Sequence, residues 1–173
     1  MAGSSVQILG TGQLLELSRR LRAASGAPVQ RNLARRIRRA AEPLHRDLQS
    51  TMRSMPIRSQ GRRPGSRGGP SPTTRPLRST LAAAIRISVR TSSNPGARVY
   101  VDKGMLPRDL KFMPEAINDA PGGRLRHPVF RNRRRWANQY VTALWWDKAV
   151  RTHTPRMTAE VARVLDDVRR QLE

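Results

Sequence analysis

The sequence predicts an α+β fold with long helices, a small antiparallel sheet and a long basic loop. Three observations support this prediction. Apolar residues recur every three or four positions over residues 28–55 and again over 154–172, which is the period of a helix. Between these stretches, short segments alternate apolar and polar residues, which is the period of a half-buried strand. Residues 56–76 keep neither period and are rich in proline, glycine, serine and arginine.

The chain is expected to consist of a flexible lead, residues 1–10, and a single domain, residues 11–173. Thr11 can cap a first basic helix, because its side-chain oxygen can accept a hydrogen bond from a free backbone N–H. Gly26 and Pro28 are expected to end this helix and begin the next.

The second helix, predicted over residues 28–55, has an apolar stripe and a basic face. The stripe consists of Val29, Leu33, Ile37, Ala40, Leu44, Leu48, Met52 and Met55. The basic face is formed by Arg31, Arg35, Arg38 and Arg39. Acidic residues that could pair with these arginines at helical spacing are almost absent, which favours an anionic partner over a merely solvated face. A proline inside this helix, Pro43, is expected to bend it.

Residues 56–76 are expected to form an extended basic arm. Its arginines could follow phosphate groups or reach a protein partner: Arg58, Arg62, Arg63, Arg67 and Arg75. No aromatic residue lies among them, which argues against a dedicated binder of single-stranded nucleic acid. The alternative is a mobile linker without a binding role.

The middle of the chain predicts a β-hairpin over about residues 85–102, preceded by one or two helical turns at 77–84. Because an isolated hairpin is only marginally stable, its apolar face should lie on the long helix or join a sheet with a short strand near 127–130. A short helix is predicted over 114–120 and is ended by the Pro-Gly-Gly sequence at 121–123.

The stretch from Arg124 to Val150 contains all three tryptophans of the chain. The residue before a proline avoids helical geometry, so the HPVF segment at 127–130 should be extended. Residues 131–135 should form a cationic loop, and the tryptophan that follows it, Trp136, should anchor the end of this loop. Candidate anchors of the subunit or of an interface are His127, Phe130, Arg133, Arg134, Arg135, Trp136, Trp145 and Trp146.

Two further helical segments are predicted towards the C-terminus. The first begins near Ala143 and carries Trp145 and Trp146, of which at most one should face the core, because neighbouring helix positions point about 100° apart. The second is capped by Thr154, has Pro155 at its first position, and should pack on the hairpin or dock a partner.

Charge is the dominant feature of the composition. The formal net charge is +22, and residues 1–101 contribute 19 arginines against three acidic residues. A genome rich in G and C would explain arginine in place of lysine, but not the shortage of acids. We therefore expect a polyanion or an acidic protein as partner. The chain has no cysteine, which excludes disulfides and thiol catalysis, and no apolar run long enough to span a membrane.

No residue pattern predicts catalysis, a metal or a cofactor. His45, His127 and His153 are far apart and show no metal-ligand spacing. The glycines of the arm are not followed by the Lys-Ser/Thr pair of a phosphate-binding loop. Motifs for sequence-specific recognition of nucleic acids are also missing, so we expect no enzymatic activity and, at most, nonspecific attraction to phosphates.

One motif carries a family resemblance. HPVF-x-N-R-x-x-W, preceded by Arg126, resembles the tail-completion (minor tail, neck) proteins of long-tailed bacteriophages, or siphophages. Outside this motif, the resemblance covers residues 12–172 in layout only.

The resemblance implies an α+β subunit of a homo-oligomeric ring, expected to be a hexamer, without enzymatic activity. The ring would join the head connector to the tail and surround a channel for double-stranded DNA. Its neighbours would be connector or stopper proteins and tail terminator or tail tube proteins. The protein would be assembled in the host cytoplasm and reside in the virion, with no membrane contact. The alternative is a free-standing, nonspecific nucleic-acid-binding protein, which would bind DNA or RNA as a monomer.

Overall fold

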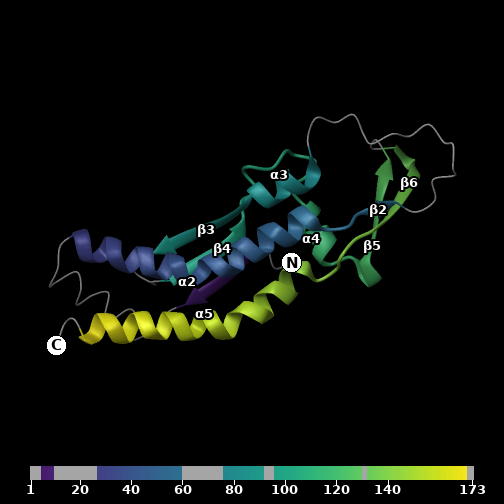
Figure 1. Ribbon diagram of the computed structural model, residues 1–173. Coiled ribbons are helices and arrows are strands. Elements are labelled where there is room, and N and C mark those ends of the chain that lie inside the picture. Colours follow the sequence, from purple (N-terminus) through teal and green to yellow (C-terminus); the bar gives the residue numbers. More distant parts are fainter. Residues whose placement is uncertain (1–4, 10–26, 60–75, 92–95, 130–131, 171–173) are drawn as a thin grey trace.

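The computed structural model describes residues 5–9, 27–59, 76–91, 96–129 and 132–170 (Figure 1). These residues form an α+β fold, as predicted, with four helices and two three-stranded antiparallel sheets. The predicted first helix, most of the basic arm and Phe130 lie outside the described residues.

Helix α2, Ala27–Ser54, confirms the predicted long helix. From Leu33 to Met52 its apolar stripe is buried, and Met55 beyond the helix end is buried as well. The basic face points away from this core, because Arg31, Arg35, Arg38 and Arg39 are all exposed. Pro43 lies inside the helix without ending it.

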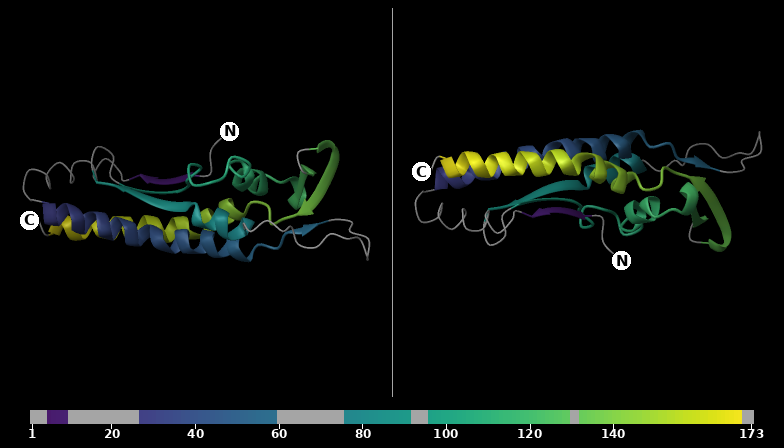
Figure 2. Two further views of the ribbon diagram at one scale, coloured as in Figure 1. Left: turned by 90° about the horizontal axis from the view of Figure 1, so that it is seen from above. Right: turned by 90° about the horizontal axis from the view of Figure 1, so that it is seen from below.

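The first sheet has the order β1-β4-β3, with β1 at Ser5–Leu9, β3 at Ile85–Arg90 and β4 at Gly96–Val101. Strands β3 and β4 confirm the predicted hairpin, and the short helix α3, Leu77–Ala83, leads into it. The expectation of a flexible lead is wrong for residues 5–9, because β1 pairs with the free side of β4. Figure 2 shows α2 and α5 in one layer and this sheet in the other.

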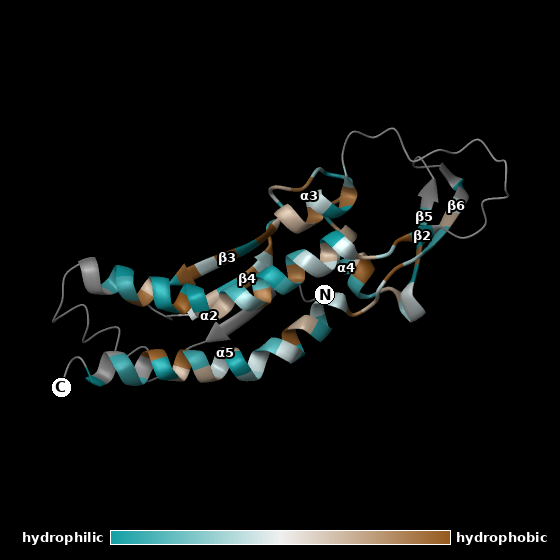
Figure 3. Ribbon diagram, in the orientation of Figure 1, coloured by the Kyte–Doolittle hydropathy of each residue, from teal (hydrophilic) through white to brown (hydrophobic). Residues whose placement is uncertain are grey.

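Helix α5, Trp145–Arg170, is one continuous helix, whereas the sequence predicted two helices separated at Thr154. Pro155 is therefore an internal residue and not the first residue of a helix. Buried residues on both sides of it, from Ala149 to Met157 and Val164, follow one seam, and burying this seam outweighs the hydrogen bond that the proline removes. The helix packs along α2 and not on the hairpin (Figures 1 and 3).

Both tryptophans at the start of α5 are buried, so the expectation that at most one would face the core is wrong. Trp145 is 2% exposed and Trp146 is 4% exposed. Their rings meet edge to face, with centroids 5.5 Å apart and an interplanar angle of 87°. Trp145 Nε1 also donates a hydrogen bond to the carbonyl of Pro114, at 3.3 Å. The core covers the start of α5 from one direction and the helix that precedes it in the chain covers it from another. Two adjacent positions that point about 100° apart can therefore both be buried.

That preceding helix, α4 at Met113–Asn118, ends in a buried asparagine that organises the start of α5. Asn118 Oδ1 accepts a hydrogen bond from the Trp146 N–H at 3.1 Å. Its Nδ2 donates to Asp119 Oδ1 at 3.1 Å and to Asp147 Oδ2 at 2.9 Å, while its main-chain carbonyl accepts from the Leu144 N–H at 2.8 Å. Asn118 thus caps a helix that begins 27 residues further along the chain.

The second sheet has the order β2-β6-β5, with β2 at Arg58–Ser59, β5 at Arg124–Val129 and β6 at Asn132–Tyr140. It lies at one end of the molecule, beyond α3 and α4 (Figure 1). The strand near 127–130 therefore joins a separate sheet and not that of the hairpin. The predicted cationic loop is also wrong for residues 132–135, which belong to β6, and Arg58 lies in a strand instead of a loop.

Pairing with β5 explains why residues 132–140 form a strand and not a loop. The apolar side chain of Leu125 packs against the core from β5, and β6 completes the sheet above it by pairing from Pro128–Trp136 to Arg124–Tyr140. The many basic residues of 131–135 predict that this segment is exposed. An exposed segment need not be a loop, because a strand can have one solvated face.

We predict that Asn118→Ala lowers the free energy of unfolding by about 1–3 kcal/mol, because it leaves the buried Trp146 N–H without an acceptor. Asn118→Asp should also destabilise, since a third carboxylate would lie beside Asp119 and Asp147. Urea denaturation measures both changes. Asn138 is a half-buried asparagine in β6 and provides the control: Asn138→Ala should change the free energy of unfolding by less than about 0.5 kcal/mol. Equal effects at the two sites would contradict the capping role.

The 3₁₀ turn Pro121–Gly123 joins α4 to the second sheet and provides a second test. Gly122 and Gly123 both have positive φ, 57° and 75°, but a Cβ on Gly123 would also lie 2.6 Å from the Val141 carbonyl oxygen. Gly122→Ala should therefore cost about 1–2 kcal/mol from backbone strain alone. Gly123→Ala should lower the melting temperature clearly more, and a smaller loss than in Gly122→Ala would refute the close approach.

Candidate nucleic-acid interface

The exposed side of the second sheet brings together basic and aromatic side chains from all three of its strands. Arg58 and Arg124 are both in register with Tyr140, one on either side of it. Arg126 and Trp136 lie further along β5 and β6. All five side chains are exposed. We call this set, Arg58, Arg124, Arg126, Trp136 and Tyr140, the arginine–aromatic face.

Alternation along the strands separates this face from a more buried one. Residues that are directly paired across strands point to the same side of a sheet. Leu125 and His127 of β5, and Ala137 and Gln139 of β6, lie at the intervening positions and are half-buried, with Leu125 packed against the core. The inner side thus fixes the sheet to the body, and the arginine–aromatic face is left towards solvent.

Each ring of the face has an arginine above it. The guanidinium carbon of Arg126 lies 4.7 Å from the centroid of the Trp136 ring, and that of Arg124 lies 6.0 Å from the Tyr140 ring. Cation–π contacts of this kind stabilise exposed sites by about 0.5–1 kcal/mol. They restrict the arginine side chains while leaving the N–H groups at the edge of each guanidinium able to donate.

Within the part of the chain that the structure describes, no acidic residue pairs with the arginines of the arginine–aromatic face. Strands β2, β5 and β6 contain no aspartate or glutamate. Among the residues that the structure describes, Arg58, Arg124 and Arg126 take part in no ion pair. Neighbouring like charges repel, so an anion bound at this face would be favoured.

A bulge in β6 adds one more exposed arginine beside the face. Pro128 is in register with Trp136, but Val129 is in register with Asn132, so β6 has three extra residues, 133–135, at this point of the ladder. Bulges commonly redirect side chains at sheet edges. Arg134 is exposed at this bulge. Arg133 and Arg135 lie in the same segment of β6, but the structure does not describe their side chains.

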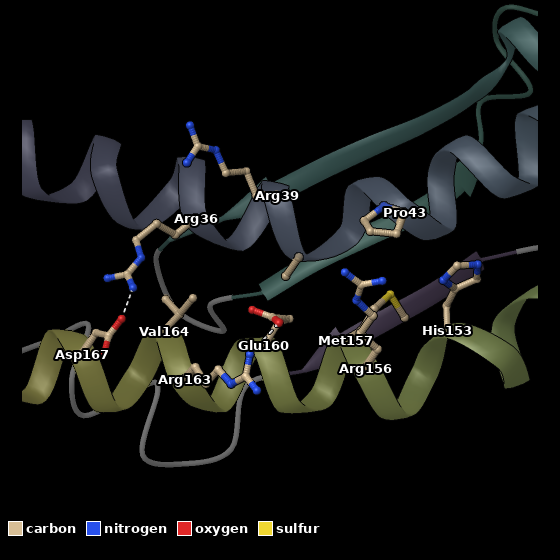
Figure 4. A pocket seen from close by; sticks show the side chains of 11 residues that line it. Arg36, Arg39, Pro43, His153, Arg156, Met157, Glu160, Arg163, Val164 and Asp167 are labelled. Atoms are coloured by element: carbon tan, nitrogen blue, oxygen red, sulfur yellow. Dashed lines mark hydrogen bonds and ion pairs between the residues drawn. The ribbon is translucent and has the colours of Figure 1, made fainter.

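A second basic region lies where α2 faces α5, and two of its four lining arginines, Arg36 and Arg163, are paired with acidic residues of α5 (Figure 4). A groove of about 370 Å³ there is lined by residues of both helices. Asp167 pairs with Arg36 and Arg170, and Glu160 pairs with Arg163. Nearby, His153 Nε2 lies 3.0 Å from Asp47 Oδ2. The Arg36–Asp167 and Asp47–His153 contacts join the two helices, whereas the Arg163 and Arg170 pairs lie within α5.

The structure sorts the residues singled out from the sequence into different places. Trp145 and Trp146 are core residues, as described above. Trp136 is 46% exposed and is therefore not a core anchor. His127 is half-buried in β5. Of the five arginines of the predicted basic arm, only Arg58 is described; Arg62, Arg63, Arg67 and Arg75 lie outside the described residues. Phe130 also lies outside them.

Three members of the face, Arg124, Arg126 and Tyr140, were not among the candidate site residues predicted from the sequence. The available signal was the spacing of two in R-L-R and of four in W-A-N-Q-Y, which places each pair on one side of a strand. Reading residues 131–135 as a loop obscured this signal, because the period of two could not then be continued.

Within the described residues, no group of three or more histidines, cysteines or acidic residues could hold a metal ion. None of the described helices combines the length and apolar character needed to cross a membrane. Comparisons with protein-family models, curated proteins and solved structures gave no significant match.

We predict that Trp136 and Trp145 differ sharply in their effect on stability. Trp145→Ala should cost about 3–5 kcal/mol, because it removes a buried ring. Trp136→Ala should cost about 1 kcal/mol or less, mainly from its contact with Arg126. Chemical denaturation of the two variants, followed by circular dichroism, checks this. A loss at Trp136 as large as that at Trp145 would show that Trp136 is buried against something.

Proposed function

We propose that this chain is a structural subunit of the neck of a long-tailed bacteriophage. In this proposal, copies of the chain form a ring that joins the head connector to the tail and surrounds the DNA channel. The ring is expected to be a hexamer in the virion, to contact connector or stopper proteins on one side and tail proteins on the other, and to have no enzymatic activity.

The observation that carries the proposal is the place of the HPVF-x-N-R-x-x-W motif in the fold. Its described residues, from His127 to Val129 and from Asn132 to Trp136, belong to β5 and β6 at one end of an elongated subunit (Figure 1). The helical body and the first sheet occupy the other end. A subunit with two distinct ends has separate surfaces for neighbours in a ring and for the contents of its channel.

The charge distribution also supports a position around DNA. A channel lined with arginine attracts phosphate without reading bases, and the chain has cationic surfaces but no base-reading motif. An excess of +22 would be hard to maintain in a dense ring of like-charged subunits unless DNA or acidic neighbours compensated it.

The arginine–aromatic face favours a second candidate, a free-standing nonspecific nucleic-acid-binding protein. It would use the same surface without forming a ring. The two functions differ in assembly, because a neck subunit has to associate with copies of itself and with neighbours, whereas a free binder acts as a monomer.

We predict that the purified chain forms a closed oligomer at about 0.5 M salt, where nonspecific nucleic acid is largely removed. Light scattering coupled to size exclusion should give a whole multiple, six under this proposal, of the 19.5 kDa chain mass. A monomer that forms this oligomer only with connector or tail subunits would agree equally well. A chain that stays monomeric with those subunits and binds DNA tightly as the salt is lowered would overturn the neck proposal.

A further inference from the structure

We propose that the arginine–aromatic face is the surface of this protein that contacts the phosphate backbone of double-stranded DNA, independently of base sequence. The inference rests on the proposed function for the identity of the polyanion. It assigns the DNA contact to the second sheet, and not to the basic face of α2.

The spacing of the arginines suits the backbone of a duplex. Arg58 and Arg124 are separated by the central strand β6, which places their backbones roughly 10 Å apart. Arg124 and Arg126 are two residues apart on one strand, or about 7 Å. The grooves of B-DNA are about 6 Å and 12 Å wide, so the three guanidinium groups span a distance comparable to one groove and can reach the phosphates that border it.

The two rings position the arginines instead of offering themselves to bases. A base that stacks on a protein needs an open aromatic surface. Arg126 lies over Trp136 and Arg124 over Tyr140, so a guanidinium already occupies one side of each ring. The planar guanidinium keeps the donors at its edge, where the fork matches the oxygens of a phosphate. The observations therefore favour duplex backbone over single-stranded bases.

The basic face of α2 lacks this organisation. Arg31, Arg35 and Arg38 project from a single helix, and no aromatic ring lies over them among the described contacts. Lower on the same helix, Arg46 pairs with Glu42 and Arg53 donates to Gln49. Long, unrestrained arginines lose more side-chain entropy when they bind. This face therefore serves as the matched comparison.

The test compares two triple variants of the full chain that lose the same charge. The sheet variant is Arg58→Gln, Arg124→Gln and Arg126→Gln, and the helix variant is Arg31→Gln, Arg35→Gln and Arg38→Gln. All six residues are exposed, so both proteins should stay folded at the assay temperature, which circular dichroism checks. The sheet variant should melt slightly lower than the helix variant, because it loses two cation–π contacts. Binding to a fluorescent 20-base-pair duplex is followed by anisotropy over a series of salt concentrations.

We expect the sheet variant to reduce the slope of log K against log salt by about 2.7, because three phosphate contacts are lost. The helix variant should change the slope by less than about 1. Duplexes of only A·T or only G·C pairs should bind equally. Equal losses in the two variants would overturn the inference in favour of overall charge, and an unchanged sheet variant would overturn it directly.

Two additional measurements distinguish the possible failures. The first uses poly-glutamate in place of an acidic protein partner. If the chain binds poly-glutamate more tightly than DNA, and this binding depends on the sheet arginines, the face is a protein contact and the inference is overturned. The oligomer mass is determined for the same samples. A ring that assembles but whose DNA binding ignores the sheet variant refutes only the inference, whereas DNA binding through the sheet by a chain that never oligomerises refutes the neck proposal.

Discussion

The architecture depends on the cap that the Asn118 side chain provides for α5. Its amide oxygen accepts the Trp146 N–H, and its amide nitrogen reaches Asp119 and Asp147. This arrangement fixes where α5 begins, and therefore how both tryptophans enter the core and how the helix is aligned with α2. The second sheet leaves the core through the same junction, where the Val141 N–H donates to the Gly123 carbonyl at 2.8 Å. A small set of buried polar contacts thus positions both ends of the molecule.

The protein separates its stability from its charge. Buried apolar residues of α2, α5 and the first sheet form most of the core, and Asp167 of α5 pairs with Arg36 of α2, which joins the two helices. The second sheet adds little to this core beyond Leu125 and its neighbours, but it carries cations without acidic partners in its strands. A surface that does not contribute to the core can carry charge that would destabilise the core itself. Such surfaces are commonly used in binding.

The candidate face illustrates how aromatic residues can serve a polar surface. Trp136 and Tyr140 are among the few exposed large hydrophobic residues of the described chain, which would ordinarily indicate an apolar docking site. Here each has an arginine above it, so the ring and the cation form one unit. The exposed aromatic residues are then explained by the positioning of charge, in agreement with a polyanionic partner.

The sequence alone determined the stripe of α2 and the β3–β4 hairpin, which follow a regular period, and the short helix near residue 114, which the Pro-Gly-Gly sequence ends. It also determined the excess of arginine, because composition does not depend on folding. Only the tertiary structure decided the other features, since they depend on residues distant along the chain. Strand β1 exists through pairing with β4, α5 continues through Pro155 because α2 covers its seam, and Trp145 and Trp146 are both buried because α4 encloses the helix start. The arginine–aromatic face has the same origin, since Arg58 reaches Tyr140 and Arg124 only when three separate segments form one sheet.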